Sequence, residues 1–413
     1  MSTPRTSSTP RTFSTPRTLL TPRTRAELAA TTLATGPATL VGRIYDPEQG
    51  GPALVAVRDD RLVDLTAAAS TASELFDRDD AVSVVREYNG DRDWPLDDVL
   101  DATFGRDASR PRLLAPIDLQ VIKAAGVTFA KSMLERVIEE RSKGDPTGAT
   151  EVRERIMSAI GDTIASIRPG SASAVRAKQV LIDEGLWSQY LEVGIGPDPE
   201  IFTKAPVLSA VGTGAQIGVL ERSNWNNPEP EVVLAVTSSG VPIGATLGND
   251  VNLRDFEGRS ALLLAEAKDN NASCAIGPFV RLFDEAFDLD DLRRIDVDLT
   301  VRGVDGFELD EVSSVSQMSR TFEELIAHAY GAHHSYPDGF VLFTGTLFAP
   351  TQDRDGSGVG FTHHRGDEVT IATPALGALI NEVTTAEDAP DWTFGIRALM
   401  ANLAARGFDG ANR

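Results

Sequence analysis

The chain has 413 residues, of which 41% are hydrophobic, and its formal net charge is −22 at pH 7. The length suggests more than one domain, and no run approaches the ~18 apolar residues that a membrane span requires. The acidic excess repels nucleic acid and anionic membranes, so neither is an expected partner. The single cysteine, Cys274, excludes an internal disulfide framework. It favours a cytoplasmic location, as does the lack of an apolar signal segment after Met1.

The first residues repeat the motif Thr-Pro-Arg-Thr every six residues between Thr3 and Thr24. Proline in every unit disfavours both helix and strand, and a six-residue period is too short for a repeat with its own core. We therefore expect residues 1–36 to be a disordered, low-complexity tail, and residues 2–24 to be dispensable. A phosphorylated or acid-binding tail is the alternative.

Residues 37–115 are expected to form a small N-terminal α/β domain. Three short runs with strand character follow one another and are joined by turns that contain Asp or Gly, at Thr39–Tyr45, Pro52–Val57 and Arg61–Leu65. A helical, acid-rich connector then continues to about Leu100. Polar residues gather less in this part of the chain than in the part that follows.

Residues 116–413 are expected to form the second, larger domain. A strand over Val121–Val127 precedes a helix, and Ser132 and Glu135 have the spacing of a capping box that would start this helix. Helical periodicity predicts two further helices within Thr150–Glu184. Strands outnumber helices beyond this point and lack regular βαβ alternation, so the fold class is predicted to be α+β and β-rich.

Two glutamates lead directly into an apolar strand, since Glu229 and Glu231 precede Val232–Val236. Alternate residues of a strand share a face, so both carboxylates can point to one place. A second apolar segment ends at Asp250, and pairing of the two segments would bring this third carboxylate to the same place. Converging carboxylates repel unless a cation lies among them, and all-oxygen ligation suits Mg²⁺, Mn²⁺ or Ca²⁺. From spacing alone, a solvated acidic strand edge is the alternative.

The other common catalytic signatures are missing from the sequence. There is no zinc spacing, no G-x-S-x-G elbow and no G-x-x-x-x-G-K-[ST] loop. All five histidines lie after residue 327, and the pair His333 and His334 either lines a site or is a surface pair.

Five stretches within roughly residues 116–383 together resemble the fumarylacetoacetate hydrolase superfamily. They are the E-x-E pair Glu229 and Glu231, the N-D-x-x-x-R-D motif from Asn249 to Asp255, Lys268 ahead of Gly277-Pro278, the pair Gly345-Thr346, and G-D-x-V…L-G-x-L-x-N from Gly366 to Asn381. The resemblance implies that family's mixed β roll with a small leading β domain. It also implies a metal held by Glu229, Glu231 and Asp250, and a homodimer or homotetramer.

One segment departs from the hydrolytic members of the family, which carry N-Y-x-x-H-x-x-E. Here Ser132 stands where the histidine would be, while Glu135 keeps the glutamate. A hydroxyl is a poor general base for water, so hydrolysis is disfavoured. This segment, together with Trp187–Pro197 and His333–Phe340, resembles the sub-group of 2-keto-3-deoxy-sugar-acid dehydratases.

The resemblance implies a Mg²⁺-dependent hydro-lyase that converts a 2-keto-3-deoxy-pentonate, such as 2-keto-3-deoxy-D-xylonate, to 2,5-dioxopentanoate in pentose oxidation. The substrate carboxylate and ketone would chelate the metal, which acidifies the proton on C3 before the C4 hydroxyl leaves. Lys268 and Glu135 are the candidates for the two proton transfers, and a neighbouring cation would lower the pKa of Lys268. Ser132 is the third residue assigned to catalysis, because a serine at this position would not activate water for hydrolysis.

Substrate contacts are also implied by the resemblance. Thr346 and the backbone of Gly345 would bind the substrate carboxylate, and Phe129 and Lys204 would make further contacts. One alternative is an acylpyruvate- or fumarylpyruvate-type hydrolase or decarboxylase that acts on a diketo acid. The other is a non-catalytic metabolite-binding protein that has kept the metal site.

Overall fold

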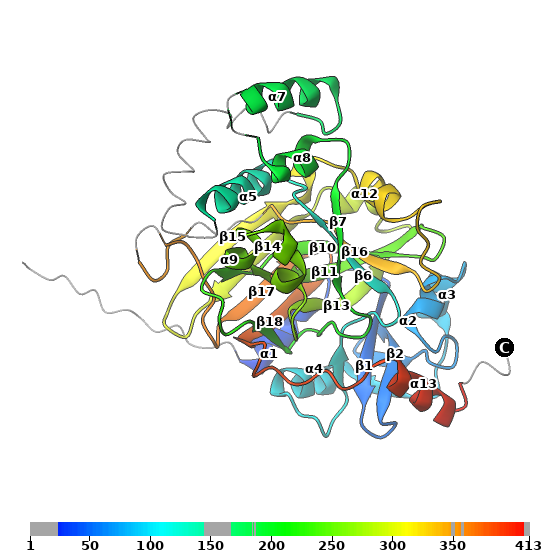
Figure 1. The fold of residues 1–413 in the computed structure, drawn as a ribbon. Helices are drawn as coiled ribbons and strands as arrows, with labels where there is room; N and C mark the ends of the chain where they lie inside the picture. Colours follow the sequence, from blue (N-terminus) through cyan, green and yellow to red (C-terminus); the bar gives the residue numbers. More distant parts are fainter. Residues whose placement is uncertain are drawn as a thin grey trace, which may run out of the picture.

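The computed structural model describes residues 24–143, 167–183, 185, 187–347, 352–356 and 359–408. The side chains of residues 130–132, 134 and 139 lie outside this description. Strands fill the centre of the molecule and helices lie around them (Figure 1). The predicted α+β, β-rich fold class is therefore confirmed. Among the described residues, no helix is both long and apolar enough to cross a membrane.

Eleven strands form one large sheet. Its order is β4 (Asp93–Pro95), β3 (Arg61–Asp64), β2 (Gly51–Arg58), β1 (Leu40–Asp46), β13 (Cys274–Leu282), β11 (Pro242–Asp250), β10 (Pro230–Val236), β16 (Phe340–Phe343), β6 (Val121–Gly126) and β7 (Glu200–Ala205), with β5 (Arg112–Leu114) paired to β1. Because β1 pairs with β13, the N-terminal strands continue the sheet of the later residues. The division into domains at residues 115 and 116 stays a prediction.

A second sheet packs against the first. It has the order β15 (Glu308–Ser314), β14 (Asp296–Arg302), β17 (Glu368–Thr373), β18 (Gly377–Thr385) and β8 (Gln216–Val219), and a short ribbon pairs β12 (Asn252–Leu253) with β9 (Asn226–Asn227). Side chains of β10 alternate between two core clusters. Leu234 packs in the cluster that holds Leu299 of the second sheet, and Val233 packs in the cluster that holds Phe76. The centre of the large sheet is thus buried on both faces.

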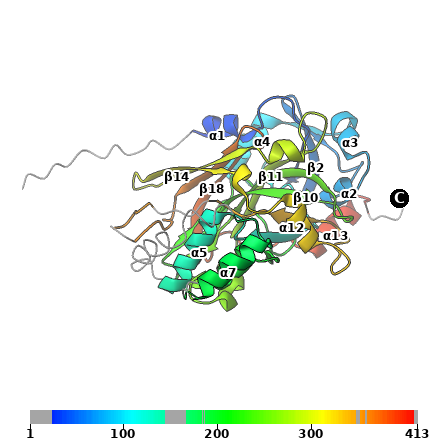
Figure 2. The same cartoon turned by 90° about the horizontal axis from the view of Figure 1, so that it is seen from above.

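Helices surround these sheets. They are α1 (Arg25–Thr32), α2 (Ala72–Phe76), α3 (Ala81–Glu87), α4 (Leu96–Gly105), α5 (Ala130–Ser142), α7 (Ala172–Asp183), α8 (Gln189–Ile195), α9 (Arg254–Glu257), α10 (Leu264–Lys268), α11 (Leu289–Leu292), α12 (Phe322–Ala329) and α13 (Ile396–Ala405). Helices α5, α7 and α8 lie together on the side of the molecule away from β1 and β2 (Figures 1 and 2). One apolar cluster joins them, with Ile138, Leu181 and Leu191 packed around Trp225. We call these three helices the helical cap.

Three local predictions need correction or fall outside the described residues. Residues 25–32 of the expected disordered tail form α1, because Thr24 and Glu27 make a capping box that satisfies its first turn. Helix α5 begins at Ala130, and the Met133 N–H donates to the Phe129 carbonyl at 3.0 Å. Ser132 therefore lies inside the first turn and does not start the helix. Residues 1–23, and the first helix expected within 150–184, lie outside the described residues.

Candidate metal centre

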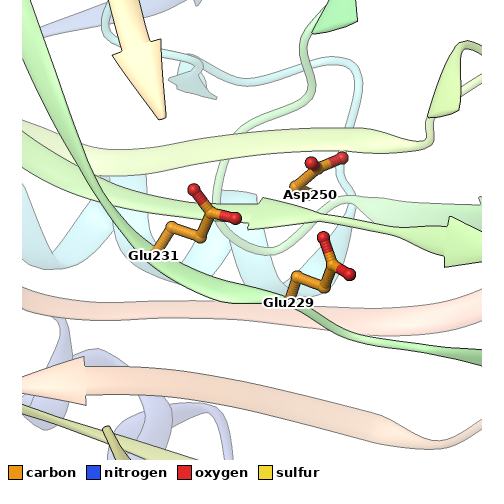
Figure 3. A group of neighbouring side chains, drawn as sticks. All are labelled: Glu229, Glu231 and Asp250. Atoms are coloured by element: carbon orange, nitrogen blue, oxygen red, sulfur yellow. The ribbon is translucent and has the colours of Figure 1, made fainter. Parts of the chain in front are cut away.

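Glu229, Glu231 and Asp250 converge at one end of the β10–β11 pair (Figure 3). One carboxylate oxygen from each lies within 4.8 Å of the others, and all three residues are buried. The antiparallel register places Glu231 opposite Gly248. The Asp250 N–H donates to the Glu229 carbonyl at 3.1 Å, so Asp250 lies beside Glu229. The predicted delivery of Asp250 by the second strand is confirmed.

The local sequence fixes this strand pair closely. The side-chain oxygen of Asn249 accepts a hydrogen bond from the Glu229 N–H at 3.1 Å, which ties the residue before Asp250 to the first glutamate. A Cβ on Gly248 would overlap the ring of Phe343 and the side chain of Val233. Glycine at this position therefore allows β11 to pack closely against the side chains of Phe343 and Val233. The positions of the carboxylates are thus set by the packing of the sheet.

Two lysines neutralise part of this negative charge. Lys268, at the end of α10, places its Nζ 2.5 Å from Glu229 Oε2 and 3.0 Å from Asp250 Oδ2. Lys204 on β7 places its Nζ 2.8 Å from Asp250 Oδ1 and donates to the Val251 carbonyl at 3.2 Å. Lys204 is fully buried. Lys204 thus lies behind the carboxylates and outside the cavity lining, and its contact with the substrate stays a prediction.

The charges in the site shift one another's pKa values. Burial raises the pKa of Glu231 well above its usual range, and the charges of Asp250 and Glu229 raise it further. Burial acts in the same direction on Asp250, but Lys204 and Lys268 outweigh it and lower the pKa of Asp250. Burial lowers the pKa of Lys268, but Asp250 and Glu229 outweigh it and raise that pKa. The downward shift of Lys268 beside a divalent cation stays a prediction for the metal-bound enzyme.

These residues fit a divalent cation. Glu231 accepts the Gly345 N–H at 2.6 Å, and burial together with the charges of Asp250 and Glu229 raises its pKa. A cation among the three carboxylates would relieve this repulsion. The donor set consists of oxygen atoms, which suits Mg²⁺, Mn²⁺ or Ca²⁺. Glu229, Glu231 and Asp250 are therefore the residues that would hold the ion.

The carboxylates open onto a cavity of about 20 Å³, which has room for about one water molecule or ion. Its walls come from the ends of β6, β7, β10 and β11, from α5, α9 and α10, and from the loop after β16. The lining residues are Ala125, Gly126, Val127, Arg136, Glu200, Phe202, Glu229, Glu231, Asp250, Glu257, Lys268, Gly345 and Thr346. Gly345 and Thr346 thus line the same cavity as the carboxylates, and their contact with the substrate stays a prediction. A five-carbon acid can enter a cavity of this size only if some of these side chains move.

The sequence analysis missed seven of the lining residues, and three of these, Arg136, Glu200 and Glu257, are charged. Arg136 contacts Glu229 Oε1 through Nη2 and lies 2.8 Å from Glu257 Oε2 through Nη1. Glu200 lines the cavity from the start of β7, opposite Gly126 of β6, and burial raises its pKa. No local pattern identifies Glu200, because the pairing of β6 with β7 brings it there.

Several residues expected at the site lie elsewhere among the described residues. Glu135 is buried on α5, and its Oε2 lies 3.5 Å from Arg254 Nη2, outside the cavity lining. Phe129 is also buried outside the lining, where it forms a bridge with Met318. The side chain of Ser132 lies outside the described ones. The roles of Glu135, Phe129 and Ser132 therefore stay predictions.

The histidine pair does not belong to this cavity. His333 and His334 are exposed, and His334 stacks on Tyr336 with 4.4 Å between ring centroids. His334 lines a separate groove of about 240 Å³ with Lys123 and Thr203. Neither histidine is among the described residues around the carboxylates, so the pair is not a source of protons for this site.

Residues 196–384 match the family described as fumarylacetoacetate (FAA) hydrolase, C-terminal. The chain is 29% identical over 336 residues to a probable 2-keto-3-deoxyxylonate dehydratase of Haloferax volcanii, a match that covers 80% of this chain and 95% of the relative. It is 32% identical over 185 residues to a 2-dehydro-3-deoxy-D-arabinonate dehydratase of Saccharolobus solfataricus, covering 45% of this chain and 58% of the relative.

Solved structures show the same fold. A 2-keto-3-deoxy-D-arabinonate dehydratase complexed with magnesium and 2,5-dioxopentanoate superposes with a TM-score of 0.58 at 23% identity, over 84% of this chain and 99% of that chain. A structure described as Cg1458 superposes with a TM-score of 0.51 at 18% identity, also over 84% of this chain and 99% of that chain. At these identities the likeness establishes the fold.

Proposed function

We propose that the protein is a Mg²⁺-dependent dehydratase of 2-keto-3-deoxy-pentonates, and the match of residues 196–384 to the fumarylacetoacetate hydrolase family is the premise of this proposal. The observation that carries the proposal is the buried convergence of Glu229, Glu231 and Asp250. The relative from Haloferax volcanii, matched over nearly its whole length, supports the reaction class. So does the magnesium and 2,5-dioxopentanoate bound by a protein of the same fold.

The proposed reaction removes a proton from C3 and the hydroxyl from C4 of the substrate, which leaves a C3=C4 double bond conjugated to the C2 ketone. Loss of a proton from C5 and gain of one at C3 then give the C4=C5 enol, which tautomerises to the aldehyde of 2,5-dioxopentanoate. A bound Mg²⁺ would polarise the C2 ketone and stabilise the negative charge that develops when the C3 proton leaves. We assign the exchange of that proton to Lys268, and its position in the cavity lining beside Glu229 and Asp250 supports this role. We assign the binding of the substrate carboxylate to Thr346, which lines the same cavity.

The departing C4 hydroxyl needs a proton donor, and the structure offers two candidates. Glu135 is the one implied by the family resemblance, but its carboxylate lies near Arg254, outside the cavity lining. Glu200 lines the cavity, and burial raises its pKa, so that it keeps its proton to higher pH than an exposed glutamate. Glu200 therefore joins Glu135 as a candidate acid.

Dehydration rather than hydrolysis is favoured by Ser132. In the hydrolytic pattern a histidine at this place would take a proton from water. Serine cannot do so near neutral pH, which leaves loss of the C4 hydroxyl as the open route. An acylpyruvate-type hydrolase or decarboxylase stays the second candidate, because Glu135 is present in this chain.

A substrate panel tests the proposed function. Both C4 epimers of 2-keto-3-deoxy-pentonate are supplied with Mg²⁺, and 2,5-dioxopentanoate is followed by a coupled aldehyde dehydrogenase, with Glu231→Gln as the inactive control. We expect aldehyde from at least one epimer and none in excess EDTA. Pyruvate release from acylpyruvates, without aldehyde from either epimer, would replace the dehydratase with a hydrolase. Binding without turnover of any compound would indicate a metabolite-binding protein.

We also propose that the enzyme works in the cytoplasm as a homodimer or homotetramer. The family resemblance supports the assembly, and the lone buried thiol of Cys274 suits a reducing compartment. Size-exclusion chromatography with light scattering measures the assembly. A monomeric mass at micromolar concentration would exclude both oligomers.

A further inference from the structure

Arg136 of α5 closes the metal cavity from the side of the helical cap. Its side chain is 11% exposed and bridges two carboxylates that are each 4% exposed. One of them is the metal ligand Glu229, and the other is Glu257 of α9. A guanidinium can hold two carboxylates at once because its donors point in fixed, separate directions.

This contact is one link in a series of alternating buried charges. The series runs Lys204, Asp250, Lys268, Glu229, Arg136 and Glu257. Both carboxylate oxygens of Glu229 are engaged within it, Oε2 by Lys268 and Oε1 by Arg136. A divalent ion that takes Oε1 of Glu229 would share this oxygen with the positive charge of Arg136, and the two cations would repel each other.

Of the two contacts that Glu229 makes, the one with Arg136 can break more easily than the one with Lys268. Lys268 bridges two of the metal-binding carboxylates, and its own carbonyl accepts hydrogen bonds from Lys204 and from the Ser273 hydroxyl. These contacts hold Lys268 in place. Arg136 keeps an ion pair with Glu257 when it leaves Glu229, so its charge stays compensated in the buried site.

We propose that Arg136 competes with the divalent metal for Glu229. In this proposal the Arg136 guanidinium leaves Glu229 when the ion binds and keeps its ion pair with Glu257, and this movement widens the cavity for substrate. The inference rests on the metal site of the proposed function, but not on the reaction. Arg136 is thus a positioning residue that links metal binding to the space available beside the ion.

The cap can stay docked during this exchange because α5 and α9 are joined by reciprocal ion pairs. Glu135 of α5 lies 3.5 Å from Arg254 of α9, while the next residue, Arg136, pairs with Glu257 of α9. The charges thus run in opposite directions between the same two helices. Loss of the Glu229 contact leaves both of these pairs intact.

Calorimetric titration with Mg²⁺ alone tests the proposal without any substrate. We expect Arg136→Gln to bind Mg²⁺ about tenfold more tightly than the unmodified protein, as for the loss of one charged contact. Glu257→Gln should weaken Mg²⁺ binding, because Arg136 then loses its ion pair with Glu257 and its charge is compensated mainly by Glu229. Arg320→Gln is the matched control, since this buried arginine donates to the carbonyls of Val193 and Gly196 beside the cap. Its Mg²⁺ affinity should not change.

Arg136→Lys separates competition from a mere effect of positive charge. Lysine keeps the charge but cannot span Glu229 and Glu257 with two arms. Competition predicts tighter Mg²⁺ binding for this variant, whereas a charge effect predicts the original affinity. Unchanged affinity in both Arg136 variants would overturn the proposal while leaving the metal site intact. Absence of Mg²⁺ binding in the unmodified protein would instead overturn the metal site and the proposal together.

Discussion

The two sides of the metal centre are built in different ways. The carboxylate side belongs to β10 and β11 at the centre of an eleven-stranded sheet, where ladder hydrogen bonds set every ligand. The cap side belongs to one helix, α5, which packs through an apolar cluster and reaches the site through charged side chains. Strand register fixes the position of a side chain more rigidly than an ion pair does. The sheet side therefore sets the positions of the proposed metal ligands, whereas the charged side chains of the cap side can change their positions.

This difference separates two properties of the enzyme. In the proposed function, Glu229, Glu231 and Asp250 on the sheet side would determine whether a divalent cation binds. Ser132 and Glu135 on the cap side lie where the family resemblance locates the choice of reaction, and Arg136 follows them on the same helix. Variants on the sheet side should therefore remove all activity, whereas variants on the cap side should change its rate or its kind.

The largest effect is expected on the sheet side. Glu229→Gln or Asp250→Asn should abolish Mg²⁺ binding and dehydratase activity, because each removes a ligand from a three-carboxylate set. Calorimetry and the coupled aldehyde assay measure the two losses, and circular dichroism checks the fold. Asp298→Asn, an exposed carboxylate on β14, is the matched control and should behave as the unmodified enzyme. Full turnover of the unmodified enzyme in excess EDTA would contradict this prediction.

The next effect concerns the source of the proton for the leaving hydroxyl. We expect Glu135→Gln to lower kcat by ~10²–10⁴-fold, the usual span for loss of a general acid or base. Glu200→Gln is the corresponding variant on the sheet side. If Glu200 is the acid, the activity of the unmodified enzyme should fall as pH rises through the raised pKa of Glu200, because Glu200 then loses the proton that it donates. The Glu200→Gln variant should not show this fall. An unchanged kcat in Glu135→Gln with a large loss in Glu200→Gln would move the acid to the sheet side.

A change in the kind of reaction is expected at Ser132. Ser132→His should lower dehydration and introduce weak cleavage of acylpyruvates, because the imidazole can take a proton from water. Pyruvate release, coupled to lactate dehydrogenase, measures the new activity. Ser142→His, at the other end of α5, is the control for adding a histidine to this helix. If Ser132→His keeps full dehydration and cleaves no acylpyruvate, Ser132 does not select the reaction.

A smaller effect, on stability, tests how tightly the sheet side is packed. Gly248→Ala should lower the free energy of unfolding by ~1–3 kcal/mol, because the new methyl group overlaps Phe343 and Val233. Urea unfolding measures the loss. Gly395→Ala is the control, since the nearest atom to its added Cβ, on Trp392, is 4.0 Å away. Equal stability of the two variants would show that β11 can move, and that the ligand positions are less fixed than proposed.

Much of the sheet side could be predicted from the sequence, because its signals are local. The two-residue period of a strand puts Glu229 and Glu231 on one face, and the next apolar run ends at Asp250. Arg136 and Glu200 could not be placed in this way. The docking of α5 and the pairing of β6 with β7 bring them to the cavity, and both depend on contacts between distant parts of the chain.

The missed helix α1 has a different cause. Its capping residue, Thr24, is also the last residue of the Thr-Pro-Arg-Thr repeat. The repeat pattern hid the capping box that Thr24 forms with Glu27, and the tail was therefore extended too far.

The smallest effect is expected from a change outside both sides of the metal centre. Deletion of residues 2–23 should leave kcat and Mg²⁺ affinity unchanged, because the repeat contains prolines and lacks apolar periodicity. The deletion stops before Thr24, because this residue caps α1, and Thr24→Ala should cost about 1 kcal/mol of stability. Helix α1 packs against α4 and β18, on the opposite side of the molecule from α5 (Figure 1). Thermal unfolding and the aldehyde assay, run on both variants, test this separation. A large loss of kcat in the deletion variant, with unchanged thermal stability, would show that the repeat acts on the metal centre after all.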